Sequence, residues 1–142
     1  MIFKMYLDMK NCFINGFILS LILMDAVAFG DELTINITGA TPNQGKLLIA
    51  VYNNAKDFPD GAPIKKVVFP ATIKQHKLDL PKGTYAIAVF QDKNDNNKLD
   101  FNFFKIPKEK MGTSGQEYLG KPTFTKAAFE ISRNQEINIK LK

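Results

Sequence analysis

The chain has 142 residues, a formal net charge of +5 and a single cysteine. A chain of this length can bury one hydrophobic core and is too short for two. Its lysines are scattered and arginine occurs once, at Arg133, whereas nucleic-acid-binding proteins concentrate basic charge on one face. We therefore expect no nucleic-acid partner.

The first thirty residues have the three-part pattern of a secretory signal. Lys4 and Lys10 flank a short polar start, the run 13–24 is largely apolar, and small residues stand at Ala28 and Gly30. The apolar run has 12 residues, against the roughly 20 that a membrane-spanning helix needs. This pattern predicts a cleaved signal peptide, and the alternative is an uncleaved membrane anchor.

The predicted cut divides the chain into a signal peptide, 1–30, and one mature domain, 31–142. Export then places the domain in the periplasm or outside the cell, with no transmembrane segment after cleavage. Cys12 lies in the leader, so the mature domain has no thiol and no disulfide. Its stability must come from packing.

The first half of the mature domain alternates apolar and polar residues, as half-buried strands do. The run 46–52 is apolar almost throughout, which is typical of a strand covered on both faces. In chain order we expect short strands at 33–38, 46–52, 67–69 with 72–73, and 77–80, joined by turns and by a loop at 53–63.

The clearest strand is 84–91, which has apolar residues on both faces and is therefore placed at the centre of a sheet. A connection of about thirty residues, 92–123, follows it, and two strands at 127–131 and 136–141 end the chain. About seven short strands without a long amphipathic helix predict an all-β fold. We expect a single antiparallel β-sandwich, immunoglobulin-like or transthyretin-like, with one long structured loop.

The long connection begins with a segment rich in Asp and Asn. Side-chain oxygens recur at Asp92, Asn94, Asn96 and Asp100, and the carbonyl of Lys98 occupies the seventh position of the series. This is the spacing of the first nine positions of an EF-hand-type calcium loop. The sequence therefore predicts a Ca²⁺ site at these five residues, whose ion stiffens the loop.

Two residues depart from that motif. Asn97 replaces the glycine of position 6, although Asn tolerates a left-handed backbone, and Phe103 replaces the bidentate glutamate of position 12. Asn102 or a distant carboxylate would have to supply the missing ligand. The alternative is a turn whose Asp and Asn side chains accept hydrogen bonds from their own backbone.

A set of residues over the second half of the chain carries a family resemblance. These residues are 85–92, Asn94, Asn96, 98–100, 103–109, Gly112, 122–124 and 127–129. Together they resemble the DUF2141 family, exported bacterial proteins of unknown function. The resemblance implies export and a β-sandwich, and it implies no reaction. The family commonly has glycine near Asn97 and Lys105, and an aromatic followed by Ser-Asn-Asn near 113–116.

The aromatic residues of the long connection suggest a contact surface. Phe101, Phe103, Phe104 and Tyr118 can act as sugar platforms or as anchors for a protein partner. For Phe103, Phe104 and Ile106 we instead expect packing that pins the loop to the sandwich. The resulting prediction is a binding or envelope-associated module whose partner is an envelope glycan or protein.

No catalytic constellation stands out. The only histidine, His76, has no orienting partner that spacing can identify, and Ser114 is not in a nucleophile elbow. We therefore expect a non-catalytic protein. The alternative is a small envelope hydrolase that uses the carboxylates of the 92–123 loop.

Overall fold

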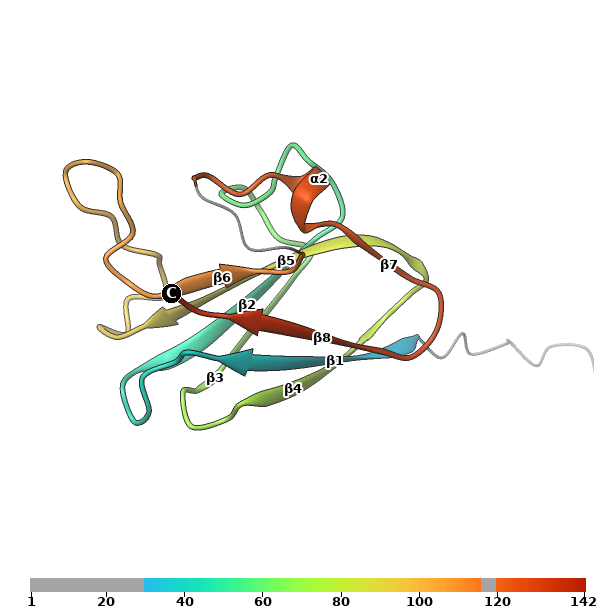
Figure 1. The fold of residues 1–142 in the computed structure, drawn as a ribbon, viewed down its shortest axis with the longest axis horizontal. Coiled ribbons are helices and arrows are strands. Elements are labelled where there is room, and N and C mark those ends of the chain that lie inside the picture. Colours follow the sequence, from blue (N-terminus) through green and yellow to red (C-terminus); the bar gives the residue numbers. More distant parts are fainter. Residues whose placement is uncertain (1–29, 116–119) are drawn as a thin grey trace, which may run out of the picture.

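The computed structural model describes residues 30–115 and 120–142, which form two packed β-sheets (Figure 1). One sheet has the order β4-β1-β8 and the other the order β3-β2-β5-β6, with β7 also paired to β5. The elements are β1 (Asp31–Thr38), β2 (Lys46–Tyr52), β3 (Lys65–Pro70), β4 (Gln75–Leu80), β5 (Gly83–Asp92), β6 (Met111–Thr113), α2 (Phe124–Ala127), β7 (Phe129–Ile131) and β8 (Gln135–Lys140).

The prediction of a β-sandwich is confirmed. The predicted signal peptide, apart from Gly30, lies outside the described residues, and within them no helix is long and apolar enough to cross a membrane.

The main core lies between the two sheets and is built from alternate residues of their strands. β1, β2 and β5 contribute three fully or nearly fully buried apolar residues each: Leu33, Ile35, Ile37, Leu47, Ile49, Val51, Tyr85, Ile87 and Val89. Burying one such aliphatic side chain stabilises a fold by about 1.5–3 kcal/mol. The alternation visible in the sequence is thus the signature of these inward faces.

A second, smaller core covers one part of the outer face of the larger sheet. Its sheet residues are Ala50 and Tyr52 on β2 and Ala86 and Ala88 on β5, and Phe58 and Ala127 complete the cluster. The rings of Tyr52 and Phe58 meet edge to face at 5.3 Å, and the Tyr52 hydroxyl donates to the carbonyl of Pro59 at 2.7 Å. Both faces of β2 and β5 are therefore buried, as predicted for 46–52 and 84–91.

β5 is the central strand because it pairs with three others. It lies against β2 over Ala86–Asp92, against β7 over Gly83–Tyr85 and against β6 over Ala88–Phe90. Ser114, which follows β6 directly, links β5 to α2, since its buried Oγ accepts the N–H of Ile87 at 2.8 Å and donates to the carbonyl of Ala127 at 2.7 Å. The Ser114 hydroxyl thus has a structural role.

Three details differ from the predicted strands. β1 and β8 pair in parallel, while every other strand pair in the described sheets is antiparallel. The extended segment predicted at 72–73 is wrong, because Ile73 N–H bonds to the carbonyl of Pro70 in a turn that carries the chain from β3 to β4. The segment predicted as a strand at 127–131 begins in α2, whose last residue, Ala127, is fully buried against β5.

Candidate functional site

The Asp/Asn segment leaves β5 in a tight turn organised by Asp92. The Asp92 side chain is buried, and its two oxygens accept the N–H groups of Asn96 at 3.2 Å and Asn97 at 2.7 Å. Asp95 and Asn97 adopt left-handed backbone conformations, with φ of 61° and 59°. Short polar residues tolerate this conformation better than other non-glycine residues, which is why the segment is rich in Asp and Asn.

Three polar side chains of this turn converge on one point. The amide groups of Asn94 and Asn96 both donate to the Asp100 carboxylate, over distances of 2.6 Å from Asn94 and 3.0 and 3.1 Å from Asn96. The Asn96 oxygen accepts the N–H of Lys98 at 2.8 Å. The structure therefore brings together three of the five predicted calcium ligands: Asn94, Asn96 and Asp100.

Glu109 is a loop carboxylate that the sequence did not place among the residues of the Asp/Asn turn. Its side chain is buried, and its oxygens accept the N–H of Lys93 at 2.8 Å and the N–H of Asp100 at 3.3 Å. Glu109 thereby joins the two ends of the Asp/Asn turn. The available signal was its place in the 103–109 tract that carries the family resemblance.

In the structure the turn is capped by its own side chains, as in the alternative to a calcium loop: oxygens of Asp92 and Asn96 accept backbone N–H groups of the same segment. Asp92 faces backbone N–H groups, and the described residues contain no group of three or more His, Cys, Asp or Glu side chains that could hold a metal ion. Of the other two predicted Ca²⁺ ligands, Asp92 accepts the N–H groups of Asn96 and Asn97, and Lys98 donates its N–H to the Asn96 oxygen. Calcium binding stays a prediction.

Beyond the turn, residues 100–108 form a small hairpin that projects from the sandwich (Figure 1). Phe101 and Pro107 form its bridge, and the Asn102 N–H bonds to the carbonyl of Ile106 at 2.9 Å. The Asn102 side-chain oxygen accepts the N–H groups of Phe104 and Ile106, both at 2.9 Å. Lys105 closes the tip with φ of 58°, the conformation for which glycine is the common choice.

The aromatic residues of this hairpin are exposed. The exposed fraction is 95% for Phe103, 78% for Phe104, 57% for Ile106 and 47% for Phe101. The expectation that Phe103, Phe104 and Ile106 pack onto the sandwich is therefore wrong. The turn at 102–105 directs the tip away from both sheets (Figure 1). The fourth predicted surface residue, Tyr118, lies outside the described residues.

A hollow of about 1150 Å³ lies beside the hairpin on the outer face of the larger sheet. Ala50 and Ala88, which are paired across β2 and β5, contribute small side chains to its lining. Phe101 and Ile106 belong to its hairpin side. On the side of the 53–63 loop it is lined by Pro59, Asp60, Gly61 and Pro63. We refer to this hollow as the outer groove.

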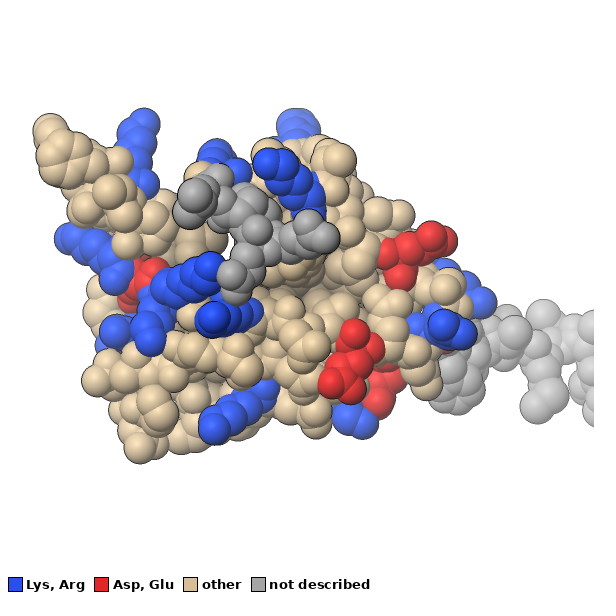
Figure 2. All heavy atoms as spheres, viewed as in Figure 1, with Lys and Arg blue, Asp and Glu red and all other residues tan. Residues whose placement is uncertain are grey.

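The lining of the outer groove includes four lysines, Lys66, Lys98, Lys105 and Lys121. Lys121 forms an ion pair with Asp60 at 2.6 Å, and the Lys66 ammonium donates to the carbonyl of Asn97 at 3.3 Å. Figure 2 shows lysine and arginine side chains scattered over one face, several of them close to the projecting hairpin. An anionic or polarisable partner suits this charge distribution.

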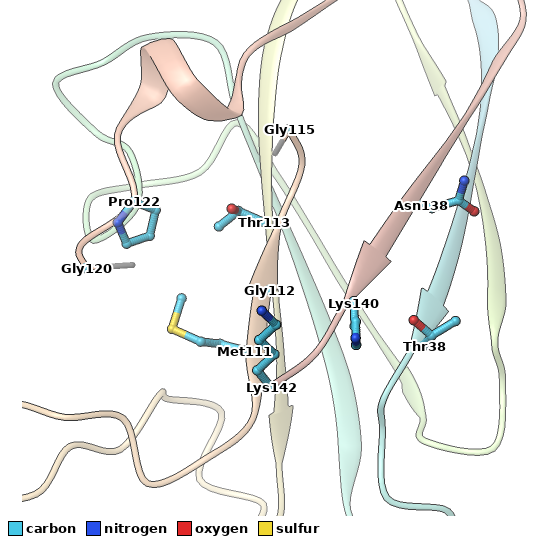
Figure 3. A pocket seen from close by; sticks show the side chains of 10 residues that line it. All are labelled: Thr38, Met111, Gly112, Thr113, Gly115, Gly120, Pro122, Asn138, Lys140 and Lys142. Carbon is cyan, nitrogen blue, oxygen red and sulfur yellow. The ribbon is translucent and has the colours of Figure 1, made fainter. Parts of the chain in front are cut away.

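A smaller pocket of about 390 Å³ lies between β6 and β8 (Figure 3). Met111 and Thr113 of β6 line one side, Asn138 and Lys140 of β8 the other. The two sheets approach closely here. A Cβ at Gly112 would lie too close to the carbonyl oxygen of Lys140, so this position requires glycine. Among the described residues, the lining includes no acid, histidine or cysteine, which are the usual general bases.

His76 lies at the edge of the sandwich, on β4, away from the hairpin. Its ring stacks on that of Phe69, with centroids 4.8 Å apart and planes 10° from parallel. Burial, together with the nearby Lys65 ammonium, lowers the pKa of His76 below its ordinary value. This environment is that of a packing residue.

Comparison with known proteins identifies one family. Residues 35–140, from within β1 to the end of β8, match the model of a family described as "Uncharacterized protein conserved in bacteria (DUF2141)". No curated protein and no solved structure matches the chain. The match covers the turn, the hairpin and the outer groove together.

Proposed function

Because the chain belongs to the DUF2141 family of uncharacterized bacterial proteins, a family that brings no known reaction, we propose its function from the site itself. The protein is an exported, non-catalytic binding module of the cell envelope. Its contact surface is the 92–123 loop, which contributes the 100–108 hairpin and one side of the outer groove. The partner is an envelope glycan or an envelope protein.

The observation that carries this proposal is the exposure of apolar side chains on an ordered hairpin. Phe101, Phe103, Phe104 and Ile106 are each exposed by 47% or more, although large apolar residues are usually buried. Contiguous exposed apolar groups on a soluble domain mark interaction surfaces. The hairpin is held by backbone and Asn102 hydrogen bonds, so it presents these groups in one arrangement.

The outer groove supports the same proposal. Its lining is largely apolar, with Ala50 and Ala88 from the sheet and Phe101 and Ile106 from the hairpin, and lysines bring positive charge. Binding sites combine apolar lining with a few polar or charged groups in this way. Its volume of about 1150 Å³ suits an extended partner better than a small molecule, since small-molecule pockets are typically about 300–1,000 Å³.

Export is the part of the proposal that rests on sequence alone. The pattern of residues 1–30 supports it, and the family resemblance points the same way. The expected mature protein begins at Asp31, which is the first residue of β1.

We also propose that calcium stiffens the Asp/Asn turn. Support comes from the convergence of Asn94, Asn96 and Asp100, whose side chains meet within 2.6–3.1 Å. A half-turn of each Asn amide group would direct its oxygen to the point that the Asp100 carboxylate faces. The turn would then lose the bonds that these oxygens accept from the N–H groups of Asn96 and Lys98, and the bound ion would have to offset that loss. Calcium would then add order to the loop without taking part in a reaction.

Binding of purified protein to a glycan array and to immobilised envelope proteins tests the proposal. The variant Phe101→Ala/Ile106→Ala should weaken binding about tenfold or more, because it removes apolar contact at the groove. The matched control is Ile64→Ala/Ile73→Ala, since these residues have similar exposed fractions, 50% and 41%, and do not line the groove.

Two results would contradict the proposal. One is equal binding by the groove variant and the control variant. The other is shortening of a bound glycan during incubation, which would favour the hydrolase alternative.

A further inference from the structure

We infer that the tip of the 100–108 hairpin is a membrane anchor for an anionic bilayer surface. Phe103 and Phe104 insert at the boundary between headgroups and acyl chains, and the hairpin lysines bind the headgroups. This inference rests on the proposed function, because it assigns a partner to the same loop. The two differ in the class of partner, since the inference names a lipid surface where the proposed function names a glycan or a protein.

The first argument is the shape of the apolar surface. Phe103 is 95% exposed and Phe104 is 78% exposed, so both rings stand out from the tip of a projecting hairpin. A protein partner would have to supply a cavity for each ring, whereas a bilayer accepts protruding rings without a preformed pocket. The rings meet edge to face, at 86°, and so do not form the flat platform on which a sugar stacks.

The second argument is that the tip pairs most of its own backbone N–H groups. An unpaired N–H group is costly in an apolar environment, so a segment that enters lipid must pair its donors internally. The N–H groups of Phe104 and Ile106 bond to the Asn102 side chain, and that of Lys105 bonds to the Asn102 carbonyl at 3.0 Å. The Asn102 N–H bonds to the carbonyl of Ile106. Four of the five N–H groups of residues 102–106 thus have a partner within the hairpin, which lowers the cost of taking the tip out of water.

The third argument is charge. Lys98, Lys105 and Lys108 are exposed on or beside the hairpin. The acidic residues near them already have partners: Asp95 forms an ion pair with Lys46 at 3.1 Å, and Asp100 accepts the Asn94 and Asn96 amide groups. Clustered lysines around protruding aromatic residues favour attraction to anionic headgroups, because lysine can extend its ammonium group to the interface.

Co-flotation with lipid vesicles tests the inference. The purified protein should float with vesicles that are rich in phosphatidylglycerol and should remain unbound with vesicles of phosphatidylcholine alone. The variant Phe103→Ser/Phe104→Ser should bind about tenfold or more weakly. The control Ile64→Ser/Ile73→Ser removes two exposed apolar residues elsewhere and should bind as the wild type does.

A second pair of variants tests the charge argument. Lys105→Glu/Lys108→Glu should weaken vesicle binding, and added salt should weaken it further, since salt screens exposed charges. Lys74→Glu/Lys82→Glu makes the same change of net charge on exposed residues outside the hairpin and should have the smaller effect. All four exchanged phenylalanine and lysine residues of the hairpin are exposed, so circular dichroism should show an unchanged fold.

The outcomes separate this inference from the proposed function. Failure to float with anionic vesicles overturns the inference, as does equal binding by the tip variant and its control. If the protein does not bind anionic vesicles but binds a lipid-free glycan or protein through Phe101 and Ile106, the proposed function stands and the membrane anchor is wrong. If vesicles bind and no glycan or protein does, the membrane anchor stands and the proposed partner is wrong.

Discussion

The carboxylate of Glu109 accepts the backbone N–H of Lys93 at 2.8 Å, across sixteen residues of chain. A single buried side chain thus connects the exit of the central strand to the return from the hairpin. The position of the hairpin relative to the outer groove depends on this connection, because the other Glu109 oxygen accepts the N–H of Asp100 at the hairpin base.

Replacement of Glu109 should destabilise the domain. Glu109→Ala removes the acceptor of the part-buried hydrogen bonds from the N–H groups of Lys93 and Asp100, and a hydrogen bond to a charged group contributes about 1.5–3 kcal/mol. Glu109→Gln should cost less, since its amide oxygen can accept one of the two bonds. Urea unfolding measures both. The control Glu130→Ala, at an exposed residue of β7, should change the free energy of unfolding by less than about 0.5 kcal/mol.

Lys105→Gly should stabilise the hairpin. Lys105 has φ of 58°, and a left-handed conformation costs a side-chain-bearing residue roughly 1–2 kcal/mol, which glycine avoids. Amide hydrogen exchange at Ile106 should slow in the Gly variant and quicken in Lys105→Val, because a β-branched side chain resists this conformation. Equal exchange rates in the two variants would show that the tip does not hold this backbone in solution.

Calcium should raise the melting temperature of the protein. At a free concentration about ten times the dissociation constant, an ion that binds only the folded state adds about 1.4 kcal/mol to stability. Thermal unfolding in millimolar calcium, compared with unfolding in a chelator, measures this. Asp100→Asn should abolish the difference, because it removes the charge at the convergence of Asn94 and Asn96. A flat response in the wild type would show that the turn needs no ion.

Stability should fall on mild acidification through His76. Its pKa is lowered in the folded state by burial and then by Lys65, so below about pH 7 the unfolded chain binds the proton more readily than the folded one. This contribution is complete above the unfolded pKa of about 6.5 and is lost as the pH falls toward the lower folded pKa. In His76→Gln the free energy of unfolding should depend less on pH in this window. Identical pH profiles for both proteins would exclude the effect.

Strands were predictable where burial on one or both faces leaves a local pattern. Leu33, Ile35 and Ile37 alternate because β1 has one buried face, and 46–52 is continuously apolar because β2 is covered on both. The segment 72–73 was misjudged because Thr72 and Ile73 favour strands by composition. Its actual conformation follows from a tertiary demand, since the chain must reverse there to reach the second sheet.

The candidate site was predictable in its local part alone. The Asp/Asn composition marked a tight turn, and the structure has Asp95 and Asn97 in left-handed conformations there. Glu109 was missed because its contact with Lys93 spans sixteen residues, and spacing rules do not reach that far. The exposure of Phe103 and Phe104 was missed because hydrophobicity indicates burial by default, whereas the direction of the hairpin decides it.

The sequence by itself determined the β class, the central strand and the turn, because residue-level preferences for extended or left-handed backbone act over a few residues. Only the tertiary structure decided what the turn supports. It holds the hairpin away from the sandwich, beside the outer groove, whose lining includes the buried Ala50 and Ala88 of the larger sheet. These relations join residues far apart in the chain, and packing, not local preference, sets which of them meet.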